Sequence, residues 1–325
     1  MRRLKAGTSH AIATVAALLV TAPPAVAWER DDLILRGVLR EVRWLDRHVR
    51  IQVPSRPMDA PDPPPLFVDR LPGEVTSARE ILATYIEEPT WPAPMPATGG
   101  PLADWFGGPA GWNQGYRHLV GGVIRLGSAP AEAARHRQAA RGAFARGEIY
   151  WGFRHLARSL AFVSALGEPL RTVPMPLGML PDLKFRRDRY ATLQDNLISA
   201  YERAIRLELQ TELKVDRGPL LKAIRTAPKL RFDDAATATR ALALYASGRG
   251  EELWGKVLVW APKRLRNRKA FVPGSAKELR PGPRTEGWED LLDHSARSLE
   301  VTAGTLRAIL LLAEGEARPS SDEEE

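Results

Sequence analysis

The feature that most constrains the fold is an apolar repeat with helical spacing near the middle of the chain. Large apolar side chains over residues 148–166 are spaced 4, 3, 4 and 3 apart, and they are Ile149, Phe153, Leu156, Leu160 and Val163. This spacing places them on one face of an α-helix. Gly147 would separate this helix from the one before it, Gly167 would end it with a positive φ angle, and Pro169 would stop its continuation. A neighbouring stripe of small residues would allow another helix to approach closely: Ala157, Ala161 and Ala165.

The same periodicity recurs along most of the chain. It predicts further helices over residues 33–51, 76–85, 128–146, 187–214, 219–227, 233–247, 250–260 and 286–313. Residues 54–73 and 89–115 are rich in Pro and Gly and are expected to form loops. No internal repeat is found, and no segment alternates for long enough to require a sheet. The sequence therefore predicts an all-α fold, a single multi-helix bundle domain with long Pro/Gly-rich loops.

The first residues have the pattern of a secretory signal peptide. A positive region with Arg2, Arg3 and Lys5 precedes the apolar run Ala11–Val20, which at about ten residues is too short to span a bilayer. Ala25-Val26-Ala27 is typical of a cleavage site. We therefore expect a signal peptide over 1–27, a helical domain over 28–313 and an acidic, disordered tail over 314–325. The mature protein would be periplasmic or extracellular, would have no transmembrane segment and would begin at Trp28.

Several classes of chemistry have no candidate motif. The chain has no cysteine, which excludes disulfides and thiolate nucleophiles. The phosphate-loop, GxGxxG, HExxH and GxSxG patterns are all absent. The histidines of the mature chain are never three or four residues apart, so no helix offers two of them to one metal ion. We expect surface or capping roles for all of them: His48, His118, His136, His155 and His294.

The charge of the chain favours anionic partners. Its formal net charge is +8, and the body between the signal region and the acidic tail is more basic still. One basic cluster recurs at helical spacing within the predicted helix 33–51: Arg36, Arg40, Arg43, Arg47 and Arg50. A second lies in a predicted loop: Lys263, Arg264, Arg266, Arg268 and Lys269. Each is either a solvated surface or an anion-binding patch for an anionic lipid, a nucleic acid or an envelope component.

The order of these features resembles the bacterial zinc-dependent phospholipase C family, relatives of the single-strand nucleases. That family begins with a Trp whose amino group binds zinc, as Trp28 would here. Its central motif, approximately S-L-H-Y-L-G-D-x-x-Q-P-M-H, is similar to SLAFVSALGEPLR at 159–171, where Ser159, Leu160 and Pro169 match. LISAYERAI at 197–205 keeps Ser199, Tyr201 and Glu202 of a second motif. WFGGP at 105–109 and VTAG at 301–304 resemble two further family segments.

Most zinc ligands that this resemblance implies are replaced. Ala161 and Ala165 stand for a His and an Asp, and non-ligating residues stand for three more histidines: Arg171, Ile198 and Trp105. Glu41 stands for a His on the first helix. Only Glu202 and Trp28 remain as possible ligands, and Glu202 could instead neutralise Arg171. Ala and Ile offer no lone pair, and a fixed guanidinium repels a dication.

These departures predict an exported, catalytically inactive phospholipase C-like protein without a cofactor. It would serve as a binding or structural module for an anionic or envelope partner. The alternative is a divergent metal-dependent phosphodiesterase, of phospholipase C or nuclease type, with a reduced zinc site or a new one built on Glu41, Glu87, Glu88 and Glu202.

Overall fold

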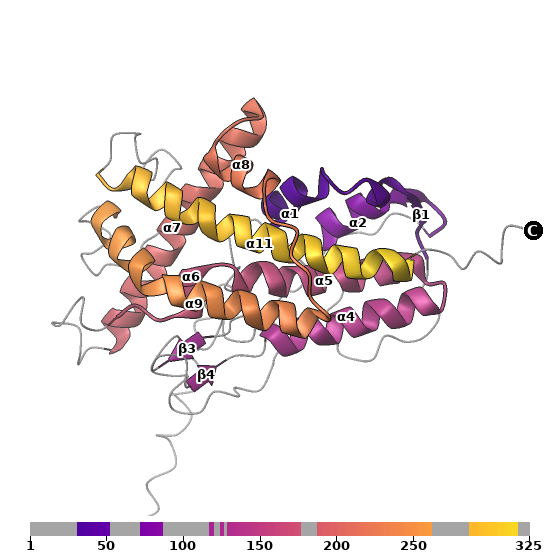
Figure 1. Cartoon of the computed structure of the whole chain (residues 1–325), viewed down its shortest axis with the longest axis horizontal. Helices are drawn as coiled ribbons and strands as arrows, with labels where there is room; N and C mark the ends of the chain where they lie inside the picture. Colours follow the sequence, from indigo (N-terminus) through magenta and orange to yellow (C-terminus); the bar gives the residue numbers. More distant parts are fainter. Residues whose placement is uncertain are drawn as a thin grey trace, which may run out of the picture.

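Helices make up most of the structure, which confirms the all-α prediction in its general form (Figure 1). The computed structural model describes residues 31–52, 72–86, 117–119, 124–126, 129–176, 187–261 and 286–317. The predicted signal peptide and most of the predicted tail lie outside these residues. Within the described part of the chain, no helix is both long and apolar enough to cross a membrane.

The described helices follow one another along the chain with few strands between them. They are α1 (Asp31–Leu39), the 3-10 helix η1 (Arg43–Asp46), α2 (Ala78–Tyr85), α4 (Ala129–Ala145), α5 (Ile149–Leu166), α6 (Pro169–Thr172), α7 (Arg187–Val215), α8 (Pro219–Arg225), α9 (Ala235–Trp260) and α11 (Trp288–Ala317). Two short antiparallel pairs complete the fold: β1 (His48–Arg50) with β2 (Val75–Ser77), and β3 (Arg117–Leu119) with β4 (Ile124–Leu126).

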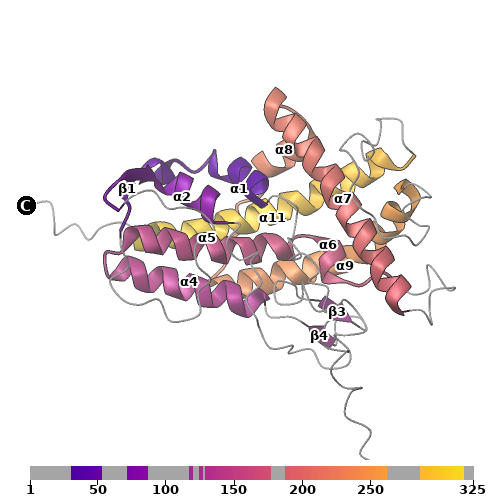
Figure 2. The ribbon, with the colours of Figure 1, turned by 180° about the vertical axis from the view of Figure 1, so that it is seen from behind.

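The bundle is built around α11, which runs along the length of the molecule (Figure 1). α5 and α9 pack against α11, α4 packs against α5, and α1 and α8 contact α11 from the other side. α7 crosses the bundle at a steep angle, as the view from behind also shows (Figure 2). The core between these helices holds fully buried large side chains, among them Trp254, Tyr150 and Phe153.

The predicted helix over 33–51 is wrong beyond Leu39. α1 ends there, and the chain continues as η1 and then β1, which pairs with β2. Arg79 explains the end of the helix, because its guanidinium donates hydrogen bonds to the carbonyls of Leu39 and Val42. Both carbonyls also accept hydrogen bonds from backbone N–H groups, those of Val42 and Leu45, in the tighter turn that follows α1. A long-range partner thus replaces the continuation of the helix, and local periodicity could not reveal it.

Two other helix ends differ from the sequence prediction. The predicted helices over 233–247 and 250–260 form one continuous helix, α9. Gly250 is needed there for packing, since a Cβ at this position would overlap Val173 and lie 3.0 Å from the carbonyl of Pro169. α11 runs on to Ala317, into the predicted tail, where Glu316 forms a 2.7 Å ion pair with Arg137 of α4.

Gly167 ends α5 as predicted, but not with a positive φ angle. Its φ is −75°, which any residue can adopt. A Cβ at this position would lie 2.7 Å from Cγ2 and 2.8 Å from Cβ of Thr302 on α11. The glycine is therefore required by the close approach of α11. Gly147 does have the positive φ that separates α4 from α5, at 72°.

The buried face of α11 carries a row of hydroxyl groups. Each donates to the carbonyl four residues earlier: Ser295 to Leu291 at 2.7 Å, Ser298 to His294 at 3.2 Å, Thr302 to Ser298 at 2.7 Å and Thr305 to Val301 at 2.9 Å. All four residues are buried. Buried hydroxyl groups need hydrogen-bond partners, and these four find them within α11 itself.

Candidate functional site

The predicted degenerate site includes a buried cluster of charged side chains where α6 meets α7. Arg171 of α6 donates from Nε to Oε1 of Glu202 on α7 over 2.6 Å. The same nitrogen lies 2.8 Å from Oε2 of Glu168, the residue that precedes α6. The side chains of Glu168 and Glu202 are 0% and 5% exposed, and that of Arg171 is 17% exposed. The prediction that Glu202 could neutralise Arg171 is therefore confirmed.

The local sequence explains how this cluster is placed. α5 ends at Gly167, and Pro169 begins α6 in its first turn, where a missing N–H costs nothing. The short helix turns the chain so that Glu168 and Arg171, three residues apart, share one side. Glu202 faces them from α7.

Within the described part of the chain, Arg171 brings two buried carboxyl groups to one guanidinium. Burial raises the pKa of Glu202 well above its usual range, and Arg171 opposes that rise. The charge of Glu168 and a hydrogen bond between the two carboxyl groups raise the pKa of Glu202 further. The arrangement favours a single proton shared by the two carboxyl groups beside one guanidinium.

Tyr201 connects this cluster to α11. It is fully buried, and its hydroxyl lies 3.0 Å from Oγ of Ser295. Because the Ser295 hydroxyl already donates to Leu291, Tyr201 is the donor in this pair. Burial raises the pKa of Tyr201, and the charge of Glu168 adds to the effect. Tyr201 therefore stays neutral and acts as a hydrogen-bond donor.

The other described positions of the predicted site are apolar or distant. Ala161 and Ala165 on α5 and Ile198 on α7 are 4%, 5% and 5% exposed, and they belong to the buried interior. Glu41 is exposed, and its charge acts on Arg307 of α11. Arg307 lies twelve residues beyond Ser295, or about 18 Å along the helix, so Glu41 is not part of the cluster.

The remaining predicted positions cannot be placed. Trp28, Trp105, Glu87 and Glu88 lie outside the described residues. Among the residues that are described, no three side chains of His, Asp or Glu converge as metal ligands would.

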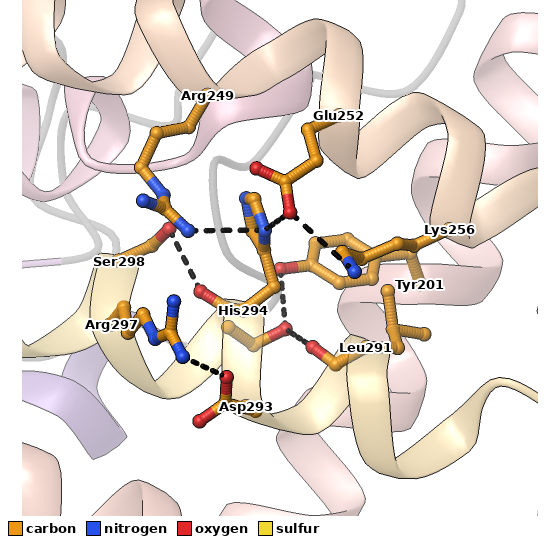
Figure 3. Close-up of polar contacts among 10 residues, drawn as sticks. Tyr201, Arg249, Glu252, Lys256, Leu291, Asp293, His294, Arg297 and Ser298 are labelled. Atoms are coloured by element: carbon orange, nitrogen blue, oxygen red, sulfur yellow. Dashed lines mark hydrogen bonds and ion pairs between the residues drawn. The ribbon is translucent and has the colours of Figure 1, made fainter.

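A second polar cluster, around His294, was missed by the sequence prediction (Figure 3). His294 on α11 is 2% exposed. Its Nδ1 lies 3.2 Å from the guanidinium of Arg249 and 3.4 Å from the carboxylate of Glu252, both on α9. Glu252 also pairs with Lys256 at 3.5 Å. The cluster joins the two long helices α9 and α11.

The surroundings of His294 lower its pKa and so favour the neutral ring. Burial lowers the pKa of His294, the charge of Arg249 lowers it further, and Glu252 opposes both effects. Nδ1 faces both the guanidinium of Arg249 and the carboxylate of Glu252, so it accepts from Arg249 when the ring proton is on Nε2 and donates to Glu252 when the proton is on Nδ1. Within the described part of the chain, this buried Nε2 has no hydrogen-bond partner. The row Leu291, Ser295, Ser298 and Thr302, spaced 4, 3 and 4 apart, was the sequence signal for a buried face next to His294.

The prediction that all histidines take surface or capping roles is also wrong for His136. This residue is 5% exposed, and its ring stacks on Phe162 at 5.8 Å and on His155 at 6.2 Å. Burial, followed by the charges of Arg135 and Arg158, lowers the pKa of His136 to about 2. His48 is exposed, as expected.

The predicted arginine face does not exist as one helix face. Arg36 lies on α1, Arg43 on η1 and Arg50 on β1, and all three are exposed. Arg40 pairs with Asp216 at 3.3 Å. Arg47 donates to the carbonyl of Ala317 at the end of α11. The second predicted cluster lies outside the described residues: Lys263, Arg264, Arg266, Arg268 and Lys269.

Comparison with known proteins adds no family assignment. No protein-family model, curated protein or solved structure matches this chain.

Proposed function

We propose that this protein is an exported, catalytically inactive relative of the zinc-dependent phospholipases C, acting as a binding module for an anionic partner. The proposal is carried by the ion pair between Arg171 and Glu202. The resemblance implies a zinc-binding His at position 171 and a zinc-binding carboxylate at position 202. Here residue 171 is an arginine, which is always positively charged, and its guanidinium forms an ion pair with the carboxylate of Glu202.

The other described positions at which the resemblance implies zinc ligands support the same conclusion. A structural or catalytic zinc ion is held by about three or four protein ligands in a fixed geometry. Ala161, Ala165 and Ile198 have no lone pair to offer and are buried. A zinc ion beside Glu202 would have to displace a guanidinium that already neutralises a buried carboxyl group, and the two cations would repel each other.

Metal analysis of the purified mature protein tests the proposal. After incubation with zinc and gel filtration, we expect no tightly bound zinc and no rise in the melting temperature. Glu202→Gln should behave in the same way. Two or three tightly bound zinc ions per chain, lost in Glu202→Gln, would contradict the proposal.

A second candidate is a divergent metal-dependent phosphodiesterase. It is favoured by Glu168, which places another buried carboxyl group beside Glu202, since carboxyl groups with raised pKa values gather at functional sites. This candidate requires hydrolysis of phosphatidylcholine or of single-stranded nucleic acid. The activity should be abolished by a chelator and by Glu202→Ala, and retained in the surface variant Glu251→Ala.

A further inference from the structure

The end of α7, α8 and the end of α1 together form a basic surface that the sequence prediction did not include. We define this α8 surface by Arg40, Lys214, Arg217, Lys222 and Arg225. Lys214, Arg217 and Lys222 are exposed, as is Arg40, and Arg225 is partly exposed. Contacts of α1 and α7 with α8 hold the three segments together.

Glu41 lies next to Arg40, and Glu208 lies one turn before Glu212, but the two acidic residues nearest the turn between α7 and α8 do not cancel the charge of that turn. Glu212 is 3% exposed and points inward, where it accepts hydrogen bonds from the backbone N–H groups of Leu220 at 3.3 Å and Leu221 at 2.7 Å. Asp216 is shared by two cations, Arg225 at 2.5 Å and Arg40 at 3.3 Å. Lys214, Arg217 and Lys222 therefore remain as an excess of positive charge around the turn between α7 and α8.

The shape of the α8 surface favours a flat partner. In both ribbon views, α8 and the adjoining end of α7 stand out from the body of the bundle (Figures 1 and 2). A convex tip can rest on a plane, whereas a nucleic-acid strand is usually held along a groove with aromatic side chains that stack on its bases. Residues 212–231 contain no aromatic residue.

The apolar residues at the tip fit the same partner. Val215 is 54% exposed, and Pro219 is also exposed. Both lie between the basic residues, where aliphatic groups can enter the headgroup region of a bilayer while Lys and Arg contact its anionic lipids.

We infer that the α8 surface docks the protein on a membrane rich in anionic phospholipid. This inference rests on the proposed function and deepens it, because it names the partner and the face that meets it. Each Lys or Arg near such a membrane strengthens binding by about fivefold, and the attraction falls with added salt.

Vesicle co-sedimentation of the mature protein tests the inference. The probes are vesicles of phosphatidylcholine alone and vesicles in which about a third of the lipid is phosphatidylglycerol. We expect binding only to the second, weakened by salt, and about 100-fold weaker in the triple variant Lys214→Gln, Arg217→Gln, Lys222→Gln. These side chains are exposed and form no ion pair within the described residues, so the variant should remain folded by circular dichroism.

A charge-matched triple variant is the control: Arg135→Gln, Arg141→Gln, Arg297→Gln. These arginines are 62%, 68% and 59% exposed and lie on α4 and α11. Equal losses in both triple variants would overturn the inference, because they would reflect net charge alone. Absence of vesicle binding, or tighter binding to single-stranded DNA than to the anionic vesicles, would also overturn it.

The two proposals fail in different ways. If the protein holds no zinc and does not bind vesicles, only the inference of a docking surface is refuted. If the protein binds zinc tightly or hydrolyses the phosphatidylcholine in either vesicle, the proposal that it is catalytically inactive is refuted, whether or not the α8 surface binds.

Discussion

Arg171 and Glu202 are held together by a 2.6 Å hydrogen bond from Nε to Oε1, which links α6 to α7 inside the bundle. A second nitrogen of the same guanidinium lies 2.5 Å from the same oxygen. Oε2 of Glu168 lies 2.8 Å from Nε of the same guanidinium. Within the described residues, this guanidinium contacts two buried carboxyl groups, and the members of the cluster should not be equally important for stability.

Removal of Arg171 should be the most damaging change in this cluster. Arg171→Met removes the guanidinium that both buried carboxyl groups contact, and we expect the free energy of unfolding in urea to fall by about 3–5 kcal/mol. Glu202→Gln leaves Glu168 to pair with Arg171 and should cost about 1 kcal/mol or less. Arg297→Met, at an exposed ion pair, is the control. Equal effects of Arg171→Met and Arg297→Met would refute the buried-cluster interpretation.

The raised pKa of Glu202 should make stability decline as pH rises. Burial and Glu168 keep the proton on the folded protein, while the unfolded chain releases it at the usual Glu pKa. The folded state is therefore favoured at low pH, and this contribution is lost as pH rises from the usual Glu range toward the folded pKa. Urea unfolding between about pH 5 and about pH 8 should show a decline that is shallower in Glu202→Gln. Identical slopes in the two proteins would exclude the shared proton.

His136 should make the fold less stable as pH falls, which is opposite to the effect of Glu202. Its pKa is lowered from 6.5 to about 2, so the unfolded chain takes up a proton below pH 6.5 while the folded chain does not. The free energy of unfolding should fall by up to about 1.4 kcal/mol for each pH unit in this window.

A phenylalanine at position 136 isolates this effect. His136→Phe keeps an aromatic ring against Phe162. It should remove the part of the fall in the free energy of unfolding with falling pH that comes from protonation of His136 in the unfolded chain. His48→Phe, at an exposed position, should leave the slope unchanged. The interpretation fails if His136→Phe and the wild type lose stability equally between about pH 6 and about pH 4.

The contact between α5 and α11 should make Gly167 intolerant of any side chain. Gly167→Ala would force its methyl group against Thr302, and overpacking of this kind costs about 1–3 kcal/mol. Gly248→Ala is the matched control, because a Cβ at this position in α9 meets nothing within 4 Å. That change should raise the free energy of unfolding by up to about 1 kcal/mol. Thr302→Ala in the Gly167→Ala protein should restore part of the loss.

Much of the helical framework follows from local sequence. The spacing of apolar residues correctly predicted α2, α4, α5, α7 and α8. The side chain of Asp234 caps α9 by accepting a hydrogen bond from Thr237 N at 2.7 Å. The errors arise where a distant residue decides the outcome. Arg79 bonds the end of α1, and the close approach of Val173 explains a glycine at position 250 inside the continuous helix α9.

The candidate site was only partly predictable for the same reason. Arg171 and Glu202 could be paired because a resemblance had suggested that both positions face one site. The part played by Glu168 depends on the turn made by α6, and the burial of His294 depends on the packing of α9 against α11. The spacing of residues along the local sequence does not reveal either of these contacts.

The hydroxyl row of α11 bears on how this bundle can change during evolution. Ser298, Thr302 and Thr305 bond to carbonyls of their own helix, so a substitution on a neighbouring helix removes none of these hydrogen bonds. Within the described part of the chain, Ser295 alone in this row also receives a hydrogen bond from another helix, through Tyr201. α11 can therefore keep its place while the sequences around it drift, with a single polar contact in this row fixing its alignment against α7.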